Sequence, residues 1–129
     1  MLPGLSAHMP EAIQYSDANG YDVETYIQIF NCLGFLMQIE VEGVWRIIQN
    51  AKKPVMTIKP FAAGRTTPFV GLHFNWNVLR DCDMITMGVM SEGEVHEDVE
   101  ISFAALERRA PALAARSSPF RQQLLGHEE

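Results

Sequence analysis

The chain contains no long hydrophobic run and no basic cluster, and each absence excludes a class of protein. No apolar segment approaches the roughly 18–20 residues that cross a bilayer. The start, Met1–Gly4, lacks the basic and apolar regions of a secretory signal. We therefore expect no membrane association and a cytoplasmic location. The 10 Lys and Arg residues are outnumbered by 16 Asp and Glu residues, and the net charge is −6. This balance argues against nucleic acid as a partner.

Cysteine is scarce, and metal-binding spacings are absent. The predicted layout places the 2 cysteines, Cys32 and Cys82, near opposite ends of the sheet, so we expect two reduced thiols and no disulfide. No His-x-x-x-His or Cys-x-x-Cys pattern occurs, and the 4 histidines are scattered. The sequence therefore predicts no metal site.

The length of 129 residues predicts one domain, and a hydrophobic content of 47% is ordinary for a globular protein. Four short apolar segments, rich in β-branched and aromatic residues, predict strands at 4–8, 24–31, 54–59 and 83–87. Each is followed by a segment of helical periodicity, predicting helices at 10–19, at 35–53, after Pro68 and from Ser91 onward. Such repetition calls for a parallel sheet with right-handed crossovers.

The predicted fold is therefore α/β, with four β/α units over residues 1–109 and a tail at 110–129 that is flexible or forms a short helix. A closed (β/α)8 barrel needs about 250 residues, so these units would form half of one. A four-stranded parallel sheet has two open edges, which invite pairing. We expect a homodimer that completes the barrel and binds a small molecule.

Alternation along the strands predicts which side chains share a face. The helices should pack on the more apolar face, and the barrel centre would then receive the polar set Ser6, His8, Gln28, Thr57, Lys59 and Thr86. A layer that merely fills the barrel is the alternative. In the last helix, the stripe expected to face inward is Val95, Val99, Ser102, Phe103 and Leu106.

Four short motifs follow the predicted strands in order. They are Gly4-Leu5-Ser6 before a Pro-Glu helix start, Gln28-Ile29-Phe30-Asn31, Lys59-Pro60-Phe61-Ala62-Ala63-Gly64, and Gly88-Val89-Met90-Ser91. Together they resemble the motifs on strands five to eight of the aldo-keto reductases, over about residues 4–109. The resemblance implies a (β/α)8 barrel, NADPH-dependent carbonyl reduction, and a cofactor held by this half. The catalytic residues of that family belong to the other half.

The resemblance implies cofactor contacts at Ser6, Gln28, Gly64, Arg65 and Gly88, with Gln28 matching only after a one-residue shift in register. Other family contacts are replaced, by Ala7, Ile58, Met90 and Asp98. Glu92 and Glu94 also occupy the first turn of the last helix, where they would repel a phosphate. We therefore expect a degraded NADP site.

Two further functions stay open. A desolvated Lys59 could act as nucleophile or base, and His8 could act as general base, although both could equally be solvated. With Ser6 they would make a small esterase-like hydrolase at the mouth of a homodimer, although Ser6 lacks the Gly-x-Ser-x-Gly elbow of α/β-hydrolases. The other alternative is a non-catalytic assembly module or a fragment of a longer barrel.

Overall fold

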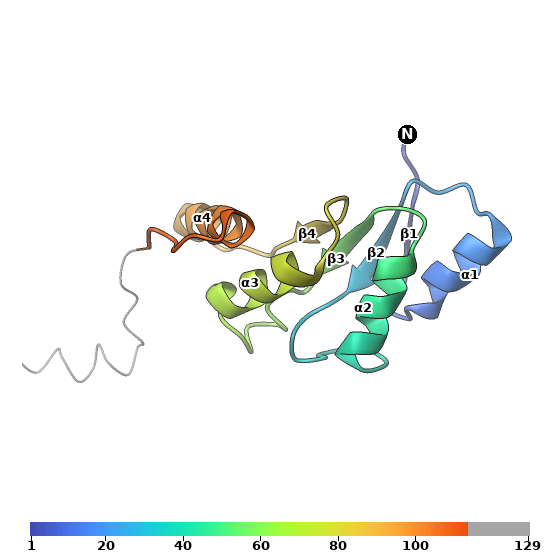
Figure 1. Cartoon of the computed structure of the whole chain (residues 1–129), viewed down its shortest axis with the longest axis horizontal. Coiled ribbons are helices and arrows are strands. Elements are labelled where there is room, and N and C mark those ends of the chain that lie inside the picture. The colour runs from blue at the N-terminus through green and yellow to red at the C-terminus, as the bar shows by residue number, and fades with distance from the viewer. Residues whose placement is uncertain (114–129) are drawn as a thin grey trace, which may run out of the picture.

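The computed structural model describes residues 1–113, and strands alternate with helices through all of them. The eight elements are β1 (Gly4–Ser6), α1 (Glu11–Asn19), β2 (Thr25–Ile29), α2 (Val41–Asn50), β3 (Val55–Ile58), α3 (Pro68–Val78), β4 (Met84–Thr86) and α4 (Glu92–Glu107). The strands form one parallel sheet in the order β1-β2-β3-β4 (Figure 1). The predicted α/β fold with four β/α units is confirmed. The part of the predicted tail from residue 114 onward lies outside the described residues.

The core lies between the sheet and the helices on one of its faces. Tyr26, Phe30 and Val55 project from the strands and pack with Ile13 of α1 and Ile48 of α2. Phe74 and Val78 of α3 add to the same cluster, so three helices cover this face. The fourth helix, α4, packs on α3 and lies at the opposite end of the molecule from α1 (Figure 1).

Two of the polar residues predicted to face the barrel centre lie on the other face of the sheet, so the prediction is wrong for them. Gln28 and Thr57 pair with each other across β2 and β3 and lie on the helix-covered face, where both are fully buried. The Thr57 hydroxyl donates to the Met84 carbonyl at 3.0 Å, so a backbone group satisfies its polarity. The prediction failed because hydrogen bonds to backbone carbonyls allow Gln28 and Thr57 to be buried beneath the helices, so the more polar residues do not mark the uncovered face.

The opposite face of the sheet is mostly apolar. Ile27, Met56 and Ile58 are half-buried on it, Met84 is exposed, and Ile29 is fully buried. The polar residues of the strands on this face are Ser6 and Thr86, which are exposed, and Thr25, which is half-buried.

The second helix begins six residues later than predicted, at Val41 instead of position 35. The intervening loop contains Gly34 and Leu36, both with positive φ, which a helix does not accept. The Asn31 side chain holds this loop: its amide oxygen accepts from the Leu33 and Phe35 N–H groups at 3.2 and 2.9 Å, and its amide nitrogen donates to the Phe35 carbonyl. The apolar periodicity of residues 35–40 therefore predicted a helix in a segment where Asn31 holds the chain in a turn.

The stripe predicted to face inward from α4 is also wrong. Val95, Val99, Phe103 and Leu106 are exposed, while Ile101 and Ala104 are buried. Ser102 is buried as predicted, with its hydroxyl donating to the Asp98 carbonyl at 2.7 Å. The helix turns its small and hydrogen-bonded residues toward the molecule, so hydrophobicity alone gave the wrong side.

A salt bridge joins elements at the N-terminal end of the sheet. Asp83 accepts from the Arg80 guanidinium at 2.8 and 3.0 Å and from the Val55 N–H at 2.9 Å. Arg80 also donates to the carbonyls of Ala51 at 2.6 Å and Lys53 at 3.0 Å. The pair therefore ties the end of α2 to the beginning of β3 and β4. The hydrogen bonds with Asp83 raise the pKa of Arg80.

Candidate functional site

Two adjoining hollows open beyond the C-terminal ends of β3 and β4. One, of about 420 Å³, is bounded by Lys59 and Thr86, and the other, of about 460 Å³, by Arg65 and Glu94. Both share the wall residues Phe61, Gly64 and Gly88. In (β/α) barrels the active sites lie at this end of the strands, which makes the two hollows the candidate site.

The loop between β3 and α3 forms the common wall and has an unusual backbone. Positive φ angles occur at Lys59 (57°), Ala62 (51°), Ala63 (55°) and Gly64 (82°). Three of these four residues carry a side chain, and non-glycine residues seldom adopt this region. Such conformations cost energy and cluster at functional sites. The backbone of this loop therefore makes it a candidate functional segment.

The beginnings of two helices meet at the hollows, and their electrostatics differ. At α3 the Thr67 hydroxyl accepts the Val70 N–H at 3.3 Å, and the first turn contains no acidic residue. At α4 the Ser91 hydroxyl accepts the Glu94 N–H at 3.3 Å, and the Glu94 carboxylate accepts the Met90 N–H at 2.6 Å. The first helix end can therefore attract an anion, whereas the second already holds a carboxylate.

Arg65 is the cation that lines the second hollow, and its guanidinium is oriented by two neighbours. It lies 3.9 Å above the centre of the Phe35 ring and donates to the Ala62 carbonyl at 3.2 Å. The cation–π contact connects the loop after β2 to the loop after β3. A bound anion would meet a positioned charge here.

The three predicted catalytic residues do not form one cluster. Lys59 is exposed at the hollow after β3, while Ser6 and His8 are exposed at the end of β1, with β2 between them and β3 in the sheet. Within residues 1–113 no hydrogen bond joins any two of the three side chains. The structure brings together Lys59, Gly64, Arg65 and Gly88 of the predicted set.

Gln28 belongs to a different part of the molecule from the hollows. Its side-chain nitrogen donates to the Ile29 carbonyl at 3.2 Å and to the His8 carbonyl at 3.5 Å. Its side-chain oxygen is buried without a hydrogen-bond partner. Gln28 therefore holds the loop after β1 against β2 from the helix side of the sheet.

Sequence reasoning missed several members of the site. Phe61, inside the motif after β3, lines both hollows, and Thr67 caps α3, but neither was predicted as a site residue. Thr86, which lines one hollow, had been predicted only as part of the polar set at the barrel centre. The Thr-Pro pair at 67–68 is a recognisable helix start and could have identified the cap.

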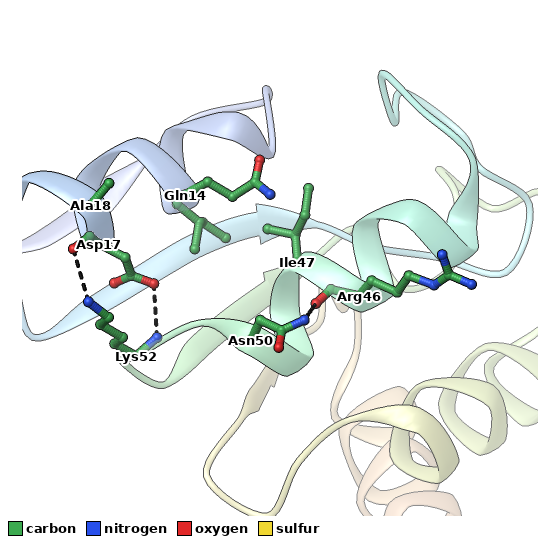
Figure 2. A pocket seen from close by; sticks show the side chains of 8 residues that line it. Gln14, Asp17, Ala18, Arg46, Ile47, Asn50 and Lys52 are labelled. Atoms are coloured by element: carbon green, nitrogen blue, oxygen red, sulfur yellow. Dashed lines mark hydrogen bonds between the residues drawn. The ribbon is translucent and has the colours of Figure 1, made fainter.

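A third hollow, of about 360 Å³, lies between α1 and α2 on the outer side of the molecule (Figure 2). Its polar groups are bonded to one another: Asp17 accepts the Lys52 N–H at 2.9 Å, and the Lys52 ammonium donates to the Asp17 carbonyl at 3.2 Å. Figure 2 shows the Arg46 side chain extending away from this pair. We regard this groove as a contact between helices.

Among residues 1–113, no group of three or more His, Cys, Asp or Glu could hold a metal ion, and no helix is long and apolar enough to cross a membrane. No protein-family model matches the chain, and no curated protein or solved structure matches it significantly.

Proposed function

We propose that the chain is one half of an aldo-keto reductase-like (β/α)8 barrel and binds a nicotinamide dinucleotide at the two hollows. The observation that carries the proposal is the apolar sheet face formed by Ile27, Met56 and Ile58. In a barrel this face is the filled interior. A second four-stranded half, most simply a second copy, would cover it.

The free edges of the sheet support the same proposal. β1 and β4 each have one neighbour in the sheet, so each presents unpaired backbone groups on its outer side. If β4 of each half paired with β1 of the other half, both edges of each sheet would be satisfied. The eight strands would then form a closed barrel. The hollows of both halves would then open at the same end of the barrel.

The residues present fit one part of a dinucleotide better than another. A side-chain carbon placed on Gly64 or Gly88 would meet no atom within 4 Å, so both backbones are open to a diphosphate. Arg65 and the unopposed N-terminus of α3 favour the same anion. The Glu94 carboxylate opposes the extra phosphate of NADP at α4. We therefore expect NADH to bind more tightly than NADPH.

The two halves of the completed barrel would contribute different groups to the reaction. The dinucleotide would supply hydride transfer, and this half would bind and orient it through Gly64, Arg65 and Gly88. The acid that protonates a carbonyl oxygen would come from the other half. Lys59, exposed at the hollow that it bounds together with Thr86, would lie beside the ligand and contribute positive charge.

Fluorescence titration of the full chain with NADH and with NADPH tests the proposal. Arg65→Ala should weaken both complexes, because it removes the cation. Glu94→Gln should tighten NADPH more than NADH, by up to about tenfold for one surface charge removed from a helix N-terminus. Arg46→Ala, in the outer groove, is the matched control and should change neither. Absence of saturable binding by either nucleotide at millimolar concentration would refute the dinucleotide site.

A non-catalytic assembly module is the second candidate, and the same apolar face favours it. A protein that only assembles needs the covered face and the paired edges, without ligand at the hollows. Dimer formation combined with no nucleotide binding would select this function over the oxidoreductase half.

A further inference from the structure

The hollow that Lys59 bounds beyond β3 and β4 combines apolar walls with a single charge. Ile58, Phe61 and Met87 are half-buried where they line it. Lys59 is the one charged residue among the described residues around it. Sites for small molecules have this character, with apolar walls and a few polar groups that fix the orientation of the ligand. The hollow therefore suits a small molecule that has an apolar body and one negative charge.

The charge of Lys59 is available to such a ligand. Its side chain makes no ion pair or hydrogen bond with any residue of the described range 1–113. The acidic residue of the neighbouring hollow, Glu94, has its carboxylate bonded to the Met90 N–H at 2.6 Å. Lys59 is also the first residue after β3 and has a φ of 57°, which costs energy for a residue with a side chain. The fold therefore holds a lysine without an acidic partner at the edge of an apolar hollow.

Further hydrogen-bond donors belong to residues that line the same hollow. Thr86 pairs with Ile58 across the sheet and is exposed, so its hydroxyl can donate to a ligand. The N–H groups of Ala63 and Gly88 make no hydrogen bond within the part of the chain that the structure describes. An ammonium, a hydroxyl and unbonded N–H groups are the donors that carboxylate oxygens accept from in proteins.

We propose that this hollow binds a small apolar monocarboxylate through Lys59 and Thr86. Phe61 and Met87 would contact the apolar body of the ligand. A phosphate monoester carries more charge than one lysine neutralises, so a carboxylate fits better. That this ligand is the substrate rests on the proposed function, in which it would be an oxo acid bound beside the dinucleotide. Ile58 and Thr86 belong to the uncovered face of the sheet, so the hollow would open toward the barrel axis and the groups of the second half.

NMR titration of the full chain with butanoate tests the site, because butanoate carries one carboxylate on a short apolar chain. Butanamide is its uncharged analogue. At constant ionic strength, butanoate should shift the amide signals of Gly64, Thr86 and Gly88 and saturate them at millimolar concentration. Butanamide should bind about fivefold more weakly, which is the upper end for one exposed ion pair.

Three lysine variants separate the charge of Lys59 from a structural effect. Lys59→Met keeps a long side chain without the charge, and it should weaken butanoate by about fivefold and leave butanamide unchanged. Lys59→Arg should restore most of the affinity for butanoate. Lys53→Met, just before the other end of β3, is the matched control and should bind butanoate as the wild type does.

Two results would overturn the carboxylate site: no saturable shift with butanoate, or equal affinity of the wild type and Lys59→Met for butanoate. Titration of the same samples with NADH distinguishes this failure from failure of the proposed function. Binding of NADH without butanoate would refute the carboxylate site alone. Binding of butanoate without NADH would confirm the site and refute its role in a reductase.

Discussion

Glu100 is a half-buried carboxylate whose hydrogen-bond partners strongly favour its charged form. Hydrogen bonds from Arg109, and then from the Ala112 backbone, lower its pKa from 4.5 to about 2. Because the pKa is lower in the folded state, the pair stabilises the fold above about pH 4.5, and the contribution is lost as the pH falls toward 2. The ion pair is on the surface, so salt will weaken it.

We predict that Arg109→Gln returns the pKa of Glu100 most of the way to its ordinary value. Carboxyl-carbon NMR titration of the wild type and the variant measures this shift directly. Arg46→Gln, an exposed arginine elsewhere, should leave the titration of Glu100 unchanged. A wild-type midpoint near the ordinary value would show that Arg109 does not hold the turn after α4 in solution.

Tyr26 makes a residue-scale link between β2 and α1. Its hydroxyl is 2.6 Å from Asp17 and 3.1 Å from Ser16, and burial together with the Asp17 contact raises the pKa of Tyr26. We predict that Tyr26→Phe lowers the free energy of unfolding by about 1.5–3 kcal/mol, the range for a hydrogen bond to a charged group. Urea unfolding measures the loss. Tyr21→Phe, at an exposed position, should have little effect, and equal losses in the two variants would contradict this reasoning.

At the scale of elements, the Arg80–Asp83 pair should be the most sensitive structural contact. Asp83 is fully buried as a side chain and accepts bonds that join two strands and the preceding turn. Asp83→Asn leaves Arg80 partly buried without its counter-charge. We predict a loss of about 3 kcal/mol in the free energy of unfolding. Thermal or urea unfolding tests this, with the exposed Asp81→Asn as the matched control; similar stabilities of the two variants would exclude a central role for the pair.

The sequence predicted the kinds and order of the elements better than their orientation. Glu11–Asn19 ends where Gly20 adopts its left-handed conformation, as expected from a local signal. The sides of β2, β3 and α4 were mispredicted, because the Thr57 and Ser102 hydroxyls and the Gln28 side-chain nitrogen donate to backbone carbonyls, which allows these polar side chains to be buried. Local patterns encode caps and turns, but such tertiary hydrogen bonds decide which face is buried.

At the scale of the whole molecule, the apolar sheet face makes a prediction about association. We expect the chain to dimerise through this face. Met56→Glu should abolish the dimer, because burying an unpaired carboxylate in an apolar interface costs a large desolvation free energy. Size-exclusion chromatography with light scattering measures the mass, and circular dichroism checks that the fold survives. Met9→Glu, at an exposed position after β1, should remain dimeric. A stable wild-type monomer at micromolar concentration would refute the completed barrel.

The candidate site was predicted only where it depends on strand order. Because the carboxyl ends of parallel strands meet at one edge, Lys59, Gly64 and Gly88 could be placed there from their positions after β3 and β4. The contact of Arg65 with Phe35 joins two loops that are distant in the sequence, so no local pattern encodes it. Of the loop residues with positive φ, Gly64 alone is of a type that favours this conformation, whereas Lys59, Ala62 and Ala63 give no such signal.

The sequential strand order also bears on how a closed ring could be encoded. If β4 of each copy lies beside β1 of the other, the ring has no natural first strand. Two copies joined in tandem would then keep the same order of units as the dimer, with a junction like the short connections at residues 20–24, 51–54 and 79–83. The same geometry would allow circular permutation, in which the chain starts at any of its strands. In such a ring each β/α unit would be related to the next by the same rotation about the barrel axis. Breaking or joining the chain at any connection would therefore leave the arrangement of the units unchanged.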